Sequence, residues 1–221
     1  MRKTISFLLY LLVGLTAVCH ANVCYATDME TLSISDLCEG DLLFCTNLQG
    51  NNITDVTQGI GGLKIDHVAI FHRITSDANA HKTQEYALEA IHKGVCLTPI
   101  DSFMARREMV VCARLKDTLG VAHSVERAMR YIGKPYDFNF MPDDSAFYCS
   151  ELVQKCYKRH DGELIFKPIP MSFHDKSGKI TKFWHDYYAK QNMKVPEGEP
   201  GSNPGDLSRS DAVMILGILR K

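Results

Sequence analysis

The chain has 221 residues, of which 25 are basic, 26 acidic and nine histidine, so its formal net charge is −1 at neutral pH. A hydrophobic content of 45% without an excess of basic residues indicates a globular protein and argues against a nucleic-acid-binding protein. The length fits one domain with enough residues to bury a proper core.

The first 26 residues have the pattern of a secretory signal peptide. Two basic residues precede an apolar run at 5–18, and small residues lead up to Ala26. We therefore expect an exported protein, periplasmic or associated with the cell envelope, whose mature domain comprises residues 27–221. An uncleaved membrane anchor would need a longer apolar run. Lipidation at Cys19 is a second alternative, but the small residue that usually precedes a lipidated cysteine is missing.

Most cysteines of the mature domain lie in apolar runs, where cysteine behaves as a small core residue. We expect buried free thiols rather than three disulfides, since a domain of this size does not need such cross-links. No C-x-x-C or H-E-x-x-H motif occurs, so the sequence supports neither a metal site nor a cofactor. The cysteines concerned are Cys38, Cys45, Cys96, Cys112, Cys149 and Cys156.

The hydrophobic pattern predicts a mixed domain of helices and strands. A strand at 66–74 and a returning strand at 85–92 are expected to form an antiparallel hairpin. Further strands are expected at 42–44 and 109–115, with a long surface loop at 47–64. Helices are expected at 101–107, at 121–132, from Asp144 or Ser145 to about residue 160, and at 180–190, whereas the Gly- and Pro-rich segment 195–206 is expected to be irregular.

Cys149 is a candidate nucleophile. A thiol attacks as its thiolate, which is favoured near the positive end of a helix and beside an imidazole. Cys149 follows a polar linker and precedes an amphipathic run at 151–158. We therefore expect its sulfur near a helix N-terminus, where backbone N–H groups can also stabilise an oxyanion. On its own, a cysteine with apolar neighbours also fits a place in the core.

Three histidines, His67, His72 and His92, lie in the apolar strands and are candidates for the base. His67 and His72 are separated by an odd number of residues, so they face opposite sides of a strand. His67 stands at the beginning of its strand, next to the long loop, where a cleft opens most easily. We expect His67 to be the base.

Glu89 is the candidate for the group that orients the imidazole. It lies in an apolar run on the strand expected to pair with that of His67, and a carboxylate in such a run must be paired or functional. A carboxylate partner fixes the tautomer of a catalytic histidine and stabilises its cation. The alternative is a carboxylate at a sheet edge that reaches water.

Seven segments spread over nearly the whole mature chain form a recognisable series. They are GDLLF (40–44), DHVAIF (66–71), LEA (88–90), GKPYDF (133–138), FYCSELV (147–153), FWHDYY (183–188) and VPEGEPGSNPGD (195–206). Together they resemble one family, the YaeF/YiiX-like cysteine hydrolases of the permuted papain-like branch of the NlpC/P60 superfamily. Histidine precedes cysteine along the chain, as in that permuted branch.

The resemblance implies an α+β papain-like fold, circularly permuted, in which a small antiparallel, barrel-like sheet packs against helices. It implies Cys149 as nucleophile, His67 as base and Glu89 as the orienting residue. Tyr136 matches a tyrosine that lies close to the nucleophile in that superfamily, although a buried structural tyrosine fits the same pattern.

The expected activity is hydrolysis of an amide bond, in a cell-wall (peptidoglycan) peptide or a related small peptide, without a cofactor. Two alternatives remain: an acyltransferase or thioesterase acting on lipid, as in permuted relatives of the lecithin-retinol acyltransferase kind, and a binding module that has kept only the fold. The pocket beside Cys149 distinguishes the first two. Charged groups would favour a peptide, and a purely apolar tunnel lined by Phe, Met and Trp184 would favour a lipid.

Overall fold

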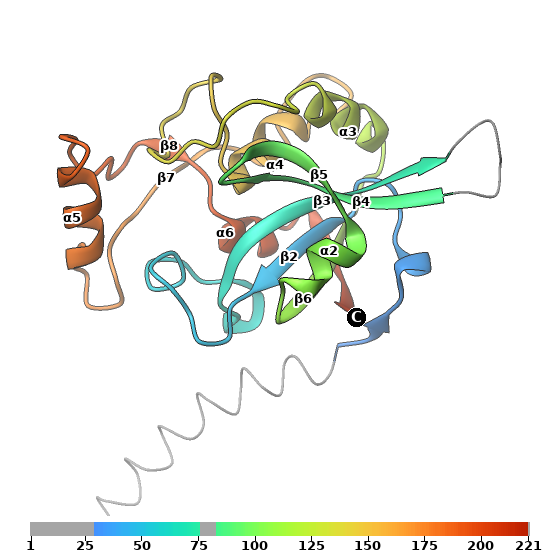
Figure 1. Ribbon diagram of the computed structural model, residues 1–221, viewed down its shortest axis with the longest axis horizontal. Coiled ribbons are helices and arrows are strands. Elements are labelled where there is room, and N and C mark those ends of the chain that lie inside the picture. The colour runs from blue at the N-terminus through green and yellow to red at the C-terminus, as the bar shows by residue number, and fades with distance from the viewer. Residues whose placement is uncertain (1–28, 76–82, 221) are drawn as a thin grey trace, which may run out of the picture.

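A computed structural model describes residues 29–75 and 83–220, and the expected signal peptide lies outside these residues. The centre of the described part is a seven-stranded sheet in the order β1-β9-β6-β2-β3-β4-β5 (Figure 1). Neighbouring strands are antiparallel except for β1 and β9. The strands are β1 (Thr31–Leu32), β2 (Leu42–Thr46), β3 (Ile65–Thr75), β4 (Thr83–Ile91), β5 (Gly94–Pro99), β6 (Met109–Leu115) and β9 (Val213–Leu219), and a separate ribbon pairs β7 (Ile169–Pro170) with β8 (Pro200–Gly201).

The central strands are covered on both faces, which explains why they read as continuous apolar runs. In β2, Leu42 and Phe44 enter one core, and Leu43 and Cys45 enter the other. Helices α3, α4 and α6 contribute to the first core, and α2 contributes to the second. The helices are α2 (Ile100–Ala105), α3 (Val121–Met129), α4 (Cys149–Cys156), α5 (Lys182–Ala189) and α6 (Pro204–Ser208), with short 3₁₀ helices at Ile34–Asp36 and Ile60–Gly62.

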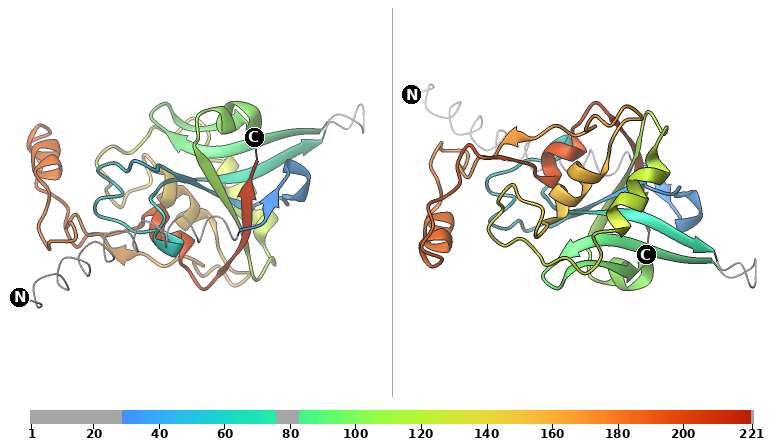
Figure 2. Two further views of the ribbon diagram at one scale, coloured as in Figure 1. Left: turned by 90° about the horizontal axis from the view of Figure 1, so that it is seen from below. Right: turned by 90° about the horizontal axis from the view of Figure 1, so that it is seen from above.

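Helix α5 stands apart from the sheet, at the end of the molecule away from the end of β3 and the start of β4 (Figure 2). An aromatic cluster holds it there, with Trp184 and Tyr188 buried against Phe173. The Trp184 indole donates to the carbonyl of Asn52 (3.3 Å), and the Tyr188 hydroxyl donates to that of Asn139 (3.2 Å). These bonds tie α5 to two loops that also border the site described below.

The β3–β4 hairpin, strand β6 and helix α5 lie where the sequence predicts them. Several elements were missed, namely the strands β1, β5, β7, β8 and β9 and the helix α6. The strand β5 begins at Gly94, where φ is +100°. On the other side of the sheet, β9 pairs with β6, and β1 forms the edge.

Several predicted helix boundaries and one predicted loop are wrong. The helix predicted at 101–107 runs from Ile100 to Ala105, with Pro99 as its N-cap. The helix predicted at 121–132 ends at Met129, and the helix predicted to reach about residue 160 ends at Cys156. The segment 195–206 is not wholly irregular, because it contains β8 and the start of α6. Helix α6 begins at Pro204, and the Asn203 side chain accepts from the N–H of Asp206 (2.8 Å). In the described ranges, no helix is long and apolar enough to cross a membrane.

Candidate active site

Cys149 is the first residue of α4, which corrects the predicted start at Asp144 or Ser145. The preceding chain is extended because the N–H of Phe147 donates to the carbonyl of Pro135 (3.0 Å), and Tyr148 keeps β geometry as the N-cap. The first N–H groups of a helix have no acceptor within it. The sulfur of Cys149 therefore lies at the positive end of the helix dipole, beside free backbone donors.

His67 lies near the start of β3 and is 8% exposed. It pairs with Cys45 of β2 at a register shift, which locally changes the direction of the strand. Its Nε2 atom is 2.8 Å from Oε2 of Glu89, which leaves Nδ1 for the sulfur of Cys149. Burial alone would lower the pKa of His67, but the charge of Cys149, a hydrogen bond to its sulfur and the bond to Glu89 raise it to about 9.

Glu89 lies on β4 with no exposed surface, and four side chains surround its carboxylate. Oε2 faces His67 and the Arg107 guanidinium (3.3 Å). Oε1 accepts from the Thr98 hydroxyl (2.7 Å) and from Arg106 (2.7 Å). Burial would raise the pKa of Glu89, but the bonds and charge of His67 together with the bonds from Thr98 and Arg106 lower it to about 2. The carboxylate is therefore charged and acts only as an acceptor.

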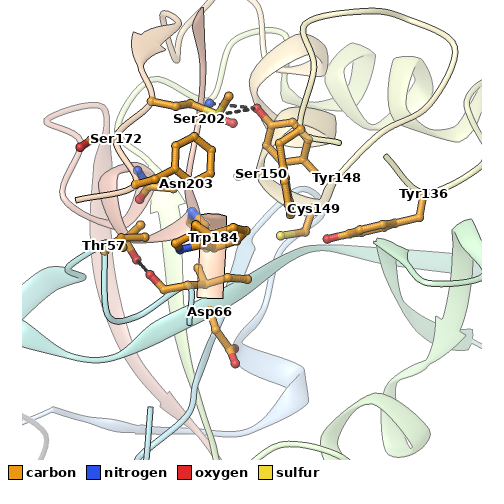
Figure 3. Close-up of a pocket in the computed structure, with 16 residues that line it drawn as sticks. Thr57, Asp66, Tyr136, Tyr148, Cys149, Ser150, Ser172, Trp184, Ser202 and Asn203 are labelled. Atoms are coloured by element: carbon orange, nitrogen blue, oxygen red, sulfur yellow. Dashed lines mark hydrogen bonds between the residues drawn. The ribbon is translucent and has the colours of Figure 1, made fainter. Parts of the chain in front are cut away.

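Tyr136 points its hydroxyl toward the Cys149 sulfur (Figure 3). A bridge with Phe147 fixes its backbone, and its ring packs edge-on against Phe138, with centroids 4.9 Å apart. Burial, followed by the charge of Cys149, raises the pKa of Tyr136 well above its usual value. The phenol therefore stays protonated and can donate a hydrogen bond at the site.

The other two candidate histidines are held elsewhere. His72 lies on the same strand as His67, and its Nδ1 atom is 2.6 Å from Oε1 of Glu39. His92 is exposed in the turn after β4. The structure thus brings Cys149, His67 and Glu89 together.

A narrow pocket opens beside Cys149 (Figure 3). Its wall is mostly apolar, formed by Ile53, Val56, Phe140, Met171, Phe173 and Trp184.

Polar side chains interrupt this apolar wall, among them those of Asp66, Ser150 and Ser202. The hydroxyl oxygens of Ser150 and Ser202 are buried and have no hydrogen-bond partner within the described residues. Oδ2 of Asp66 accepts from the Asn51 side chain (2.6 Å). The pocket is therefore neither a purely apolar tunnel nor a strongly charged cleft.

Several residues of the site were not identified from the sequence. Asp66 directly precedes His67 in the DHVAIF segment, and this position next to the expected base could have identified it. Arg106 and Arg107 form an adjacent basic pair at the end of a predicted helix, but only the fold brings them to Glu89. No sequence pattern identified Ser150 and Ser202 as pocket residues, because only the fold brings the two side chains to the same pocket.

The six cysteines that the structure describes are all free thiols. Within residues 29–75 and 83–220, no group of three or more His, Cys, Asp or Glu side chains is arranged to hold a metal ion.

Comparisons with known proteins identify the family. The model of the family described as permuted papain-like amidase enzyme, YaeF/YiiX, C92 family, matches residues 36–216. The uncharacterized protein YiiX of Escherichia coli (strain K12) is 38% identical over 78 residues, which are 33% of this chain and 38% of YiiX. A crystal structure described as metalloprotein YiiX from Escherichia coli O157:H7 has a TM-score of 0.62 and 22% identity, over 80% of this chain and 94% of that chain, and so shows the same fold. Because the family model spans most of the chain, the protein belongs to the permuted papain-like amidases of the YaeF/YiiX family, C92.

Proposed function

We propose that the protein is an exported cysteine hydrolase that cleaves an amide bond through an acyl-enzyme, with Cys149 as nucleophile, His67 as base and Glu89 as the orienting carboxylate. The observation that carries the proposal is the arrangement at one pocket of a helix-start cysteine and a histidine bonded at 2.8 Å to a fully buried carboxylate. This is the geometry of an activated nucleophile with an oriented base.

In the first half-reaction, the thiolate of Cys149 attacks the amide carbon, and the carbonyl oxygen takes the negative charge. Backbone N–H groups at the start of α4 stabilise that charge, with the Tyr136 hydroxyl as an additional donor. The imidazolium of His67 then gives its proton to the amine nitrogen as the C–N bond breaks. A thioester on Cys149 and a free amine result.

In the second half-reaction, neutral His67 takes a proton from water, which attacks the thioester carbon. The C–S bond breaks, releasing a carboxylic acid and restoring the thiolate and imidazolium. Glu89 stays ionised throughout, because its pKa of about 2 is far below neutral pH. It holds the imidazole in one orientation and stabilises the cation.

The pocket supports a small peptide amide as the substrate, with the cell-wall peptide as the natural source for an exported enzyme. Asp66 is the only carboxylate among the residues that line the pocket, and no Lys or Arg lines it. A carboxylate in the lining of the pocket suits a substrate that carries a free amine. The unpaired hydroxyls of Ser150 and Ser202 suit a substrate that offers hydrogen-bonding groups.

An acyl lipid is the second candidate substrate, favoured by the apolar wall. Phe140, Met171, Phe173 and Trp184 could hold a hydrocarbon chain beside the sulfur of Cys149. The two candidates differ in which side chains they need. A peptide amine needs Asp66, whereas an acyl chain needs only the apolar wall.

Hydrolysis of paired substrates tests the proposal. We would measure kcat/KM for a short peptide amide with a free α-amine, for its N-acetylated form and for a fatty-acyl thioester. The peptide proposal expects the free amine to be preferred, and Asp66→Asn to remove most of that preference. Asp55→Asn, on the adjoining loop and outside this pocket, is the matched control and should leave it intact. A preference for the acyl thioester that Asp66→Asn does not alter would favour the lipid substrate instead.

A further inference from the structure

One oxygen of Glu89 is shared between His67 and an arginine. Oε2 lies 2.8 Å from Nε2 of His67 and 3.3 Å from the Arg107 guanidinium. The other arginine, Arg106, binds Oε1 together with Thr98. The two arginines therefore meet the carboxylate at different atoms, and only Arg107 shares an oxygen with the imidazole.

Arg107 is fixed in this position by the end of α2. Its N–H donates to the carbonyl of Met104 (3.1 Å), and its guanidinium carbon lies 5.2 Å from the centre of the Phe103 ring. The side chain is 18% exposed, against 43% for Arg106. The charge of Arg107 is therefore less screened by water than that of Arg106.

The charges around His67 come from several elements. In the proposed triad the sulfur of Cys149 on α4 and the carboxylate of Glu89 on β4 are negative, and Asp66 is the neighbour of His67 along β3. Arg107, after α2, is positive.

Two further titratable groups lie nearby and stay neutral. Cys45 faces His67 from β2, and burial raises the pKa of its thiol. Tyr136 stays protonated, as described above. Without the charge of Arg107, the imidazole would lie among anions with no nearby buried cation to offset them.

We propose that Arg107 is a positioning and charge-balancing residue of the active site, whose guanidinium, bound to the same Glu89 oxygen as His67, limits how tightly the imidazolium holds its proton. This inference rests on the triad proposed above. Arg107 acts through Glu89 and His67 and touches no substrate. Its role differs from that of Arg106 and Thr98, which hold the opposite oxygen and keep the carboxylate from rotating.

The chemistry explains why such a limit is useful. The thiolate and Glu89 both favour the imidazolium and, against the effect of burial, raise the pKa of His67 to about 9, while the charge of Arg107 acts in the opposite direction. An imidazolium that holds its proton too tightly is a poor acid for the departing amine and a poor source of the neutral base needed for deacylation. A fixed cation nearby keeps the pKa of His67 closer to the pH range in which the imidazole can act both as an acid and as a base.

Alkylation kinetics can test this without a known substrate. Anionic iodoacetate is attracted to a thiolate–imidazolium pair more than neutral iodoacetamide, so the ratio of the two rates at Cys149 should fall as His67 loses its proton. We expect this midpoint near pH 9 in the wild-type chain. In Arg107→Gln the midpoint should move upward by about 0.5 to 1 pH unit, the size expected for loss of one partly screened charge.

Two variants control for structural effects. Arg107→Lys keeps the charge and should keep the midpoint near the wild-type value, and Arg106→Gln should shift it less than Arg107→Gln. An unchanged or lowered midpoint in Arg107→Gln, or an equal shift in Arg107→Lys, would overturn the role of Arg107. If instead the wild-type ratio shows no fall with pH, or Cys149 is not the fast-reacting thiol, the proposed triad itself is wrong.

Discussion

The Nε2 atom of His67 lies 2.8 Å from Oε2 of Glu89, on a side chain that has no exposed surface. Because the carboxylate is ionised, the imidazole must donate from Nε2, and the tautomer with Nδ1 toward Cys149 follows. Removing the charge of Glu89 should therefore act mainly through the imidazole of His67.

Glu89→Gln tests the charge of the orienting residue. The amide keeps the shape and one hydrogen bond but loses the charge that stabilises the imidazolium, so we expect amide hydrolysis to fall by about 10- to 1000-fold. Steady-state kinetics on the best peptide substrate would measure this. Glu85→Gln, on the same strand and paired with Arg73, is the control and should have little effect. Unchanged turnover in Glu89→Gln would remove Glu89 from the triad.

Stability at low pH should also depend on Glu89. Its folded-state pKa of about 2 is below the ordinary value of 4.5, so its ionisation contributes stability that is fully present above pH 4.5 and is lost as the pH falls toward 2. The contribution corresponds to about 3 kcal/mol. In urea unfolding, the free energy of unfolding of the wild-type protein should fall between pH 6 and pH 3, and this fall should be missing in Glu89→Gln. The variant should be less stable than the wild type at pH 6, because two arginines lose their partner. Parallel pH curves for both proteins would contradict this assignment.

The sequence predicted the strand pair that carries the base and its partner because the relevant signals are local. The apolar run around His67, the returning run around Glu89 and the odd spacing to His72 all follow from strand alternation. The segment before Cys149 was predicted less well. Residues 144 and 145 resemble a helix start, but long-range bonds between Phe147 and Pro135 keep the chain extended until Tyr148.

The parts that were missed depend on contacts between distant segments. Arg107 and Thr98 reach Glu89 only because α2 and β5 fold back onto β4. The unpaired hydroxyl of Ser202 joins the pocket from a Gly- and Pro-rich segment that the sequence indicated as irregular. Periodicity cannot predict such contacts, because it describes each segment separately.

Tyr136→Phe tests the additional donor. The substitution removes one hydroxyl near the Cys149 sulfur and leaves the ring packing against Phe138, so we expect turnover to fall by about 10-fold with little change in thermal stability. Tyr86→Phe removes a hydroxyl that donates to the side chain of Gln84 and serves as the control. Wild-type turnover in Tyr136→Phe would make this tyrosine purely structural.

Export can be tested on the purified native protein. The basic start, short apolar run and small residues up to Ala26 predict cleavage by a signal peptidase. Intact-mass and N-terminal peptide analysis should find a new N-terminus near Thr27 in the envelope fraction. Replacing residues 5–18 with a polar sequence should leave the precursor uncleaved. An intact Met1 in the native protein would contradict export with cleavage.

The triad predicts which cysteine reacts fastest, and the chain contains its own controls. Burial is the main cause that raises the pKa of both Cys112 and Cys156 to about 12, so these thiols should stay unlabelled by iodoacetamide at pH 6. The exposed Cys38 provides a solvent-accessible free thiol for comparison. Peptide mapping by mass spectrometry should find Cys149 labelled well before Cys38 at this pH.

The variants then separate the nucleophile from its base. In His67→Ala the thiolate loses its imidazolium partner, so labelling of Cys149 at pH 6 should fall to the rate of Cys38, and turnover should be nearly abolished. In Cys149→Ala turnover should vanish while the fold survives, because the small side chain at a helix start leaves little cavity. Circular dichroism and a thermal melt would verify that the fold is retained. Fast labelling of Cys156 in the wild-type protein, or low-pH labelling of Cys149 that persists in His67→Ala, would show that the thiolate is stabilised by groups other than His67.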